Sequence, residues 1–247
     1  MSHGSLLLYA VLPYLAIATF VVGHIWRYRR DQYRWGARSS QLLESKVLAW
    51  GSVIFHLGVL AAIAGHVFGV LIPISWTRSV GLHDEPYHVL AVIGGVSAGA
   101  ATVVGFAILV YRRIRFPRVR VTTRRIDVIA MGLLAVGIVT GMWATLGNIS
   151  ESVHYRENVA PYFRSLFIGD PRPELMTRAE GVALIFQVHV VAVWFLYAAW
   201  PFSRLVHAWS IPVDWFRRSP IPYRGRSSRS RPTAPRVPAG VSMRGER

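Results

Sequence analysis

Five long apolar runs dominate this chain of 247 residues and constrain its fold more than any other feature. A helix needs about 20 apolar residues to cross the hydrocarbon core of a bilayer, and each run is about that long. Only 16% of the residues are charged, against about 25% in soluble domains. We therefore predict an all-α integral membrane protein, a five-transmembrane-helix bundle with antiparallel neighbours. The runs are Leu6–Trp26, Val47–Ile72, Tyr87–Tyr111, Ile126–Gly147 and Val182–Trp200.

The basic residues predict how this bundle is oriented. The chain has 28 lysines and arginines against 12 acids, a net charge of +16. Residues 27–46, 112–125 and the part after residue 203 hold 23 of these 28 and fall on one side of a five-helix bundle. Basic links favour the cytoplasmic side, so we expect the N-terminus outside and the C-terminus inside. Because the arginines lie in short links between apolar runs, membrane topology explains the charge better than a nucleic-acid partner.

The composition also predicts two domains and limits the possible cofactors. We assign residues 1–216 to the membrane domain and the Arg-, Pro- and Ser-rich residues 217–247 to a disordered cytoplasmic tail. The chain has no cysteine, which excludes disulfides, thiolate metal sites and covalently attached c-type haem. Any cofactor must be bound by histidine, methionine or carboxylate side chains.

His24 and His88 lie at the ends of apolar runs, where an imidazole is easily satisfied, and four other histidines lie within the second and fifth apolar segments. His56 and His66 lie in the second run, and His189 and His207 lie in the fifth run and its continuation. Ionisable side chains within a bilayer are costly and usually mark function. The two runs cross the membrane in opposite directions. His66 and His189 are therefore expected at one depth near the outer side, and His56 and His207 at one depth near the inner side.

Two histidines from facing helices can bind zinc, copper or haem iron. Zinc takes about four ligands, and no carboxylate lies at the depth of either pair. Haem needs only two axial imidazoles, and bis-imidazole ligation favours electron transfer. We therefore predict two b-type haems. A haem-free transporter that uses the same histidines is the alternative, but Asp127 is the only acid in the later spans.

The spacing of the four histidines does not fit two straight helices. His56 and His66 are ten residues apart, whereas His189 and His207 are eighteen apart. Two parallel columns of ligands should have similar separations. Pro201 lies within the longer interval and could kink the helix there.

Two further motifs each allow two interpretations. Gly51, Gly58 and Gly65 recur every seven residues, which suits either close helix packing or room for a flat macrocycle. Arg112 and Arg204 lie at the inner rim, where arginines could bind haem propionates. The alternative for these arginines, above all for Arg112, is anchoring at the cytoplasmic interface.

Four stretches of the sequence carry a resemblance to a known family. They are Ser45–His66, Pro117–Thr123, Pro161–Phe167 and, most specifically, Pro201-Phe202-Ser203-Arg204-Leu205-Val206-His207-Ala208-Trp209-Ser210. Together they make roughly residues 5–216 resemble the gamma subunit of membrane-bound respiratory nitrate reductase, a dihaem cytochrome b. A cytochrome b anchor of another respiratory complex, heterodisulfide- or sulfite-reductase-like, is the alternative of similar architecture.

The resemblance implies roles for particular residues. His66 and His189 would ligate the iron of the outer haem, and His56 and His207 that of the inner haem. Quinol would be oxidised beside the outer haem, near Gly65 and His66. The best-known members place a lysine at that site near the start of the third helix, where this chain has Tyr87 and His88.

The resemblance also implies partners and a location. The chain would sit in the cell membrane of a prokaryote and take electrons from membrane quinol. On the cytoplasmic side it would meet an iron–sulfur beta subunit and, beyond it, a molybdenum-containing alpha subunit that reduces nitrate.

Overall fold

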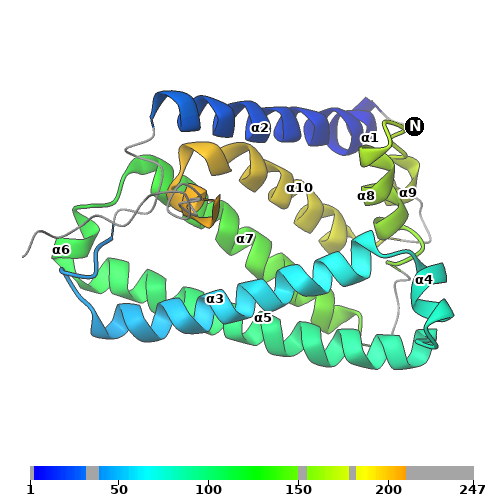
Figure 1. Ribbon diagram of the computed structural model, residues 1–247, viewed down its shortest axis with the longest axis horizontal. Helices are drawn as coiled ribbons and strands as arrows, with labels where there is room; N and C mark the ends of the chain where they lie inside the picture. The colour runs from blue at the N-terminus through cyan, green and yellow to red at the C-terminus, as the bar shows by residue number, and fades with distance from the viewer. Residues whose placement is uncertain (1–2, 32–38, 150–154, 178–181, 210–247) are drawn as a thin grey trace, which may run out of the picture. The chain divides into compact units, whose positions relative to one another are not determined.

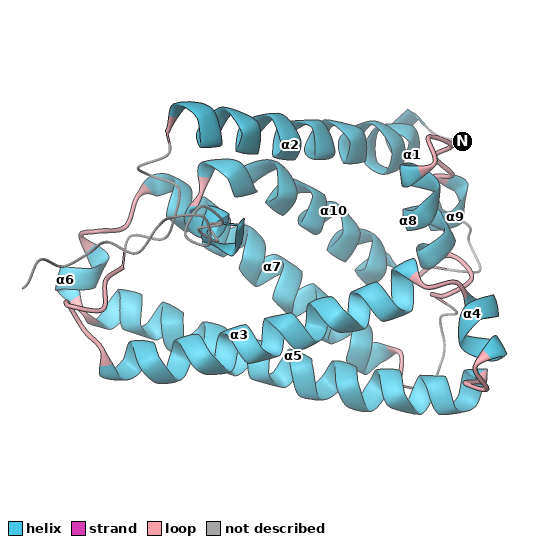
Figure 2. Ribbon diagram, viewed as in Figure 1, coloured by secondary structure: helices cyan, strands magenta, loops and turns pink. Residues whose placement is uncertain are grey.

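A computed structural model describes residues 3–31, 39–149, 155–177 and 182–209, and all regular structure among them is helical (Figure 2). Five helices are long and apolar enough to cross a membrane. They are His3–Arg30, Lys46–Leu71, Asp84–Arg115, Arg125–Gly147 and Leu184–Phe202. The prediction of an all-α fold with five membrane helices is confirmed. The predicted orientation stays a prediction, and the tail from residue 217 lies outside the described residues.

Each span is one helix or a helix continued by a tighter or wider turn. The spans comprise α1 (His3–Leu6), the π turn η1 (Leu7–Val11) and α2 (Leu12–Arg30); α3 (Lys46–His66) and the π turn η3 (Val67–Leu71); α5 (Asp84–Arg115); α7 (Arg125–Gly147); and α10 (Leu184–Ala199) with the 3-10 turn η4 (Trp200–Phe202). The links hold four short helices: α4 (Ile74–Ser79), α6 (Pro117–Arg120), α8 (Val159–Phe167) and α9 (Glu174–Thr177). A second 3-10 segment, η5 (Arg204–Trp209), follows the fifth span.

The spans pack in an order that differs from their order along the chain. Helix α3 lies along α5, α7 packs against both α5 and α10, and α10 packs against α2 (Figure 1). Helices α3 and α10, which carry three of the four intramembrane histidines, have no such extended packing with each other in the described part of the chain. Side chains therefore have to bridge between α3 and α10.

The glycine stripe of α3 divides into two parts. A Cβ atom at Gly51 would lie 2.7 Å from Cγ2 of Ile108, and one at Gly58 would lie 2.5 Å from the backbone nitrogen of Thr102. These two glycines therefore allow α3 to pack closely on α5. A Cβ atom at Gly65 would meet nothing within 4 Å, so the outer member of the stripe leaves open space beside the backbone.

The fifth span ends in a bend that accounts for the uneven histidine spacing. Helix α10 stops at Ala199, and Pro201 lies within the 3-10 turn that follows. The chain then passes through an extended residue, Ser203, before η5 begins. His189 and His207 are therefore separated by a broken segment and not by five turns of a straight helix. Proline causes such an end because it cannot donate the next helical hydrogen bond.

The link between the fourth and fifth spans is fixed by its own small core. Helix α8 buries Tyr162 and Leu166 in a cluster with Tyr9 of the first span and Trp194 of the fifth. The hydroxyl group of Tyr14 also donates to the carbonyl of Leu166 at 3.0 Å. Burial raises the pKa of Tyr162. The contacts fix α8 against the first and fifth spans.

Candidate functional site

The outer pair of histidines comes together across the bundle. His66 is the last residue of α3, and His189 lies within α10. Their ring centroids are 6.1 Å apart, and the ring planes are inclined by 27°. His66 also stands where the α-helix passes into the π turn η3. Such π turns are frequent at functional sites.

The inner pair is formed by α3 and η5. The rings of His56 and His207 have centroids 5.9 Å apart, with an angle of 73° between their planes. The structure thus brings together the same two pairs that the depth argument joined. That these side chains ligate haem iron stays a prediction.

In all four histidines, Nδ1 lies within hydrogen-bonding distance of a backbone carbonyl oxygen. The distances are 2.7 Å from His56 to Ser52, 2.7 Å from His66 to Ala62, 3.0 Å from His189 to Gly137 and 2.7 Å from His207 to Arg204. A carbonyl oxygen can only accept, so Nδ1 carries the proton in each ring and a neutral ring has its lone pair on Nε2. Metal-ligating histidines are typically fixed by such a bond from the other ring nitrogen.

The separation of the paired rings suits one metal ion between them. An ion held by two imidazoles on opposite sides, with bonds of about 2 Å, separates the ring centroids by about 6 Å. Among the described residues, no group of three or more histidine, cysteine, aspartate or glutamate side chains could hold a metal ion. The pairs therefore fit the two axial positions of haem iron better than a four-ligand zinc site.

The bend that brings His207 to its place is held by the first span. The guanidinium group of Arg27 donates to the carbonyl oxygens of Pro201 at 2.8 Å and Ser203 at 3.4 Å. Gly23 permits the approach, since a Cβ atom there would lie 2.8 Å from the Pro201 ring. Arg27 is buried, so its role extends beyond the interfacial charge that the sequence suggested.

The two arginines predicted at the inner rim differ in their surroundings. The Arg112 guanidinium is buried and donates to the carboxylate of Glu44 at 2.6 Å and to the backbone and hydroxyl oxygens of Ser40. Arg204 donates from Nε to the carboxylate of Asp127 at 2.9 Å. Arg112 therefore fixes the segment before α3, and Arg204 lies on the segment that carries an inner histidine. A propionate contact stays a prediction for both.

Glu44 also caps the start of α3. Its carboxylate oxygens accept from the backbone N–H groups of Val47 at 2.8 Å and Leu48 at 3.2 Å. Burial raises the pKa of Glu44, but these amides and the Arg112 guanidinium outweigh that effect and hold the pKa below its ordinary value. The charged carboxylate therefore stabilises this helix start.

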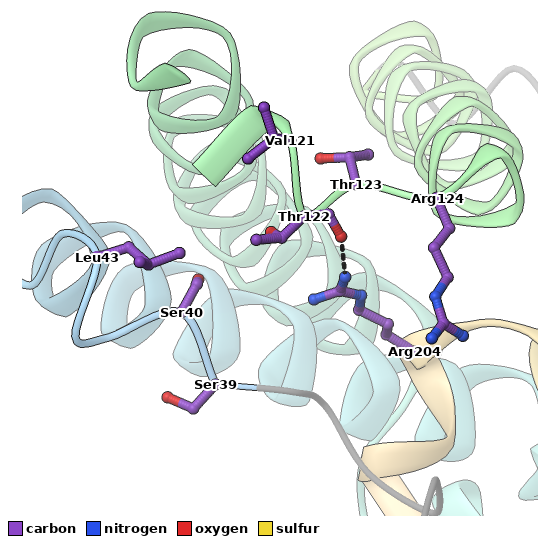
Figure 3. A pocket seen from close by; sticks show the side chains of 8 residues that line it. All are labelled: Ser39, Ser40, Leu43, Val121, Thr122, Thr123, Arg124 and Arg204. Atoms are coloured by element: carbon purple, nitrogen blue, oxygen red, sulfur yellow. Dashed lines mark hydrogen bonds between the residues drawn. The ribbon is translucent and has the colours of Figure 1, made fainter. Parts of the chain in front are cut away.

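A polar pocket of about 430 Å³ opens beside Arg204 (Figure 3). Hydroxyl groups and two arginines make up most of its lining, which consists of Ser39, Ser40, Leu43, Val121, Thr122, Thr123, Arg124 and Arg204. The Arg204 guanidinium points to the carbonyl of Thr122 and donates to it (Figure 3). The pocket is rich in hydrogen-bond donors, as a site for anionic groups requires.

Two of the residues predicted to bind quinol, Tyr87 and His88, are engaged in contacts with other parts of the chain. Tyr87 is buried, and its hydroxyl lies 3.0 Å from that of Tyr155. Arg156 covers the Tyr87 ring at 3.7 Å. His88, the next residue, points to the end of α7 and donates from Nε2 to the carbonyl of Ile149 at 3.0 Å. Open space lies beside Gly65, and contact of any of these residues with quinol stays a prediction.

Sequence reasoning missed three residues that support the site. Arg27 holds the bend, Thr140 of α7 lies 3.1 Å from Nδ1 of His189, and Arg156 covers Tyr87. A threonine in an apolar run is an ordinary helix residue, so the sequence offers no signal for Thr140. The burial of Arg27 follows from its contact with a residue 174 positions away, which no local pattern indicates.

The fold and the site together define a multi-pass helical membrane protein with two facing histidine pairs, one between α3 and α10 and one between α3 and η5. The chain belongs to the nitrate reductase gamma subunit family, which it matches over residues 5–226. Membership of this family implies alpha and beta partner subunits in a nitrate reductase complex. The family favours that complex over the alternative anchors considered from the sequence.

Relatives from several bacteria are similar over most of this chain. The nitrate reductase gamma chain of Bacillus subtilis is 41% identical over 222 residues, which cover 90% of this chain and 98% of that protein. The respiratory nitrate reductase 1 gamma chain of Escherichia coli is 34% identical over 88% of this chain and 96% of that protein. The nitrate reductase-like protein NarX of Mycobacterium tuberculosis is 42% identical over 89% of this chain, but the match spans only 34% of that longer protein.

Proposed function

We propose that this chain is the quinol-oxidising dihaem cytochrome b subunit of a respiratory nitrate reductase. The observation that carries the proposal is the geometry of the two histidine pairs. Their ring centroids are 6.1 and 5.9 Å apart, and each Nδ1 is bonded to a carbonyl. An axial ligand needs a ring that is held in place with its proton on Nδ1, and the bonds from Nδ1 to the carbonyls provide both.

Each histidine pair would hold one haem. His66 and His189 would ligate the outer haem, and His56 and His207 the inner haem. Bound b-type haem would supply reversible one-electron transfer at each pair. The Nδ1 bonds make the four imidazoles more basic and prevent the rings from rotating.

Quinol would be oxidised at the outer end of the bundle, beside Gly65 and His66. The open space next to Gly65 would admit a flat quinol ring close to the outer histidine pair. Protons released there would leave on the outer side while electrons move inward, so that turnover would charge the membrane. At the cytoplasmic face the iron–sulfur beta subunit would accept the electrons for the molybdenum-containing alpha subunit.

The direction of electron flow depends on orientation in the cell membrane. The proposal places residue 160 outside and the chain after residue 216 inside, in agreement with the distribution of basic residues. A reporter enzyme active only outside the membrane should therefore work when fused near residue 160 and fail when fused after residue 216. The opposite pattern would reverse the proposed assignment of outer and inner pairs.

Replacing single histidines tests the proposed path. In the assembled complex, His66→Ala should remove the outer haem and prevent quinol from reducing the haem that remains. His56→Ala should remove the inner haem and leave an outer haem that quinol still reduces. Both variants should lose quinol–nitrate activity yet reduce nitrate with a soluble dye that donates directly to the partner subunits. If quinol reduced the surviving haem of the His66 variant at the full rate, the quinol site would not lie at the outer pair.

A further inference from the structure

Helix α7 carries none of the four paired histidines, yet it contacts both α10, which carries His189, and η5, which carries His207. It packs against α10, and its first turn is joined to η5 by an ion pair. We propose that α7 is the positioning helix of the site: it sets the orientation of His189 through Gly137, Thr140 and Gly141, and that of His207 through Asp127. This inference rests on the proposed function, because it assigns these residues a role toward the bound haems.

Helix α7 forms a cradle for the His189 ring. Nδ1 of His189 lies 3.0 Å from the carbonyl oxygen of Gly137 and 3.1 Å from the hydroxyl oxygen of Thr140. The Thr140 hydroxyl donates its own hydrogen to the carbonyl of Val136 at 2.7 Å. Its oxygen therefore accepts from Nδ1–H, and the imidazole proton is shared between two acceptors of α7.

Gly141 completes this cradle by lacking a side chain. A Cβ atom at Gly141 would lie 2.9 Å from Cε1 and 3.3 Å from Nδ1 of His189. The ring therefore rests on the backbone of α7, and its plane is fixed by the helix surface as well as by hydrogen bonds. Any side chain at this position would force the ring to move.

At the other pair, contacts lead from Asp127 through Arg204 to His207, and we call this series the inner relay. The Asp127 carboxylate, 5% exposed, accepts from the backbone N–H of Arg124 at 3.0 Å and from Nε of Arg204 at 2.9 Å. Arg204 is the first residue of η5, and its carbonyl oxygen accepts from Nδ1 of His207 at 2.7 Å. Asp127 thus fixes the residue whose carbonyl orients the inner histidine.

The histidines of α3 need no such support. His56 and His66 bond through Nδ1 to the carbonyls of Ser52 and Ala62, four residues earlier in the same helix. Each proposed haem would therefore have one ligand that its own helix orients and one that α7 orients. A change in α7 should then alter one ligand of a haem while the other stays in place.

The outer cradle can be tested with matched variants in the assembled complex. Thr140→Val should shift the EPR signal of the oxidised outer haem and raise its midpoint potential, because a less basic imidazole stabilises the oxidised iron less well. Thr145→Val is the control, since the Thr145 hydroxyl bonds only to the carbonyl of Gly141 at 3.0 Å. Parent-like spectra for Thr140→Val, or equal shifts for both variants, would overturn the inference for the outer pair.

A second pair of variants tests the steric part of the cradle. Gly141→Ala should shift the outer signal further than Thr140→Val or abolish it. Gly132→Ala lies on the same helix, where a Cβ atom would meet nothing within 4 Å, and should leave both haem signals unchanged. If Gly141→Ala kept the parent signals, the His189 ring would not rest on α7.

The inner relay is tested by Asp127→Asn, with Glu44→Gln as its control. Both changes neutralise a carboxylate paired with an arginine, but only the Asp127–Arg204 pair is joined to a histidine. Asp127→Asn should shift or abolish the inner haem signal, keep the outer one, and be rescued in part by Asp127→Glu. Equal effects of Asp127→Asn and Glu44→Gln, or unchanged spectra for Asp127→Asn, would overturn the relay.

The haem content of the unmodified complex distinguishes failure of this inference from failure of the proposed function. If the unmodified complex lacks two b-type haems in its membrane subunit, the proposed function fails. If it contains two haems and the Thr140, Gly141 and Asp127 variants keep parent spectra, only the positioning role of α7 fails.

Discussion

The two segments that bring the histidines together are built in opposite ways. Helix α3 is regular from Lys46 to His66, and its two histidines are oriented by their own helix. The fifth span is interrupted after Ala199, and His207 follows in a short 3-10 segment. Its histidines depend on distant residues of α2 and α7. One histidine of each pair is therefore oriented by its own helix, and the other depends on tertiary contacts.

This difference predicts where mutations act. Changes on the packing face of α3 should affect the whole bundle, because α3 packs closely against α5. Changes in the residues that support the fifth span should affect one histidine pair. Changes at the start of α3 should be smallest, because several contacts share that task.

The largest effect is expected where α3 packs on α5. Gly58→Ala would place a Cβ atom 2.5 Å from the backbone nitrogen of Thr102, and such overpacking costs about 1–3 kcal/mol or more. We expect a strong loss of the folded subunit and of both haem signals in membranes. Gly65→Ala has open space and should accumulate like the parent. Equal amounts of both variants would show that α3 does not depend on this contact.

An intermediate effect confined to one pair is expected at the bend of the fifth span. Arg27→Gln would withdraw donors from the carbonyls of Pro201 and Ser203, and an unsatisfied buried polar group costs about 1–3 kcal/mol. The inner haem should be lost from part of the population while the outer haem is retained, as haem content and EPR would measure. Arg30→Gln, at an exposed position of the same helix, is the control. Loss of both haems together would contradict a local role for Arg27.

The sequence predicts the regular parts of this molecule well and the irregular parts poorly. Apolar runs are long enough to identify all five spans, and their alternating directions pair the histidines by depth. Gly58 and Gly65 occupy equivalent positions in the heptad stripe, yet only the neighbour α5 distinguishes them.

The supports of the fifth span could not be predicted from the sequence for a similar reason. Asp127 and Arg204 are 77 residues apart, and their ion pair arises from the way α7 and η5 meet. Pro201 did indicate a break in the helix. The bend at Ser203 is held by Arg27. The sequence shows only that Arg27 lies at the end of the first span and gives no sign of this contact.

The smallest effect is expected from acid at the start of α3. The pKa of Glu44 is lowered in the folded state, so its stabilising contribution is complete above the unfolded-state pKa of about 4.3. That contribution is lost as the pH falls through the lower folded-state pKa. Thermal unfolding followed against pH should therefore show a modest acid destabilisation in the parent protein that is weaker in Glu44→Gln. Identical pH profiles would mean that the Glu44–Arg112 pair contributes nothing to stability.

The most direct test of the central claim is the haem content of the purified complex with its iron spin state. Two histidine pairs with rings about 6 Å apart predict two b-type haems in this chain, both low-spin in the oxidised EPR spectrum. His189→Ala should remove the outer signal and His207→Ala the inner one. A single haem, a high-spin signal from half of the iron, or the same signal lost in both variants would contradict the account.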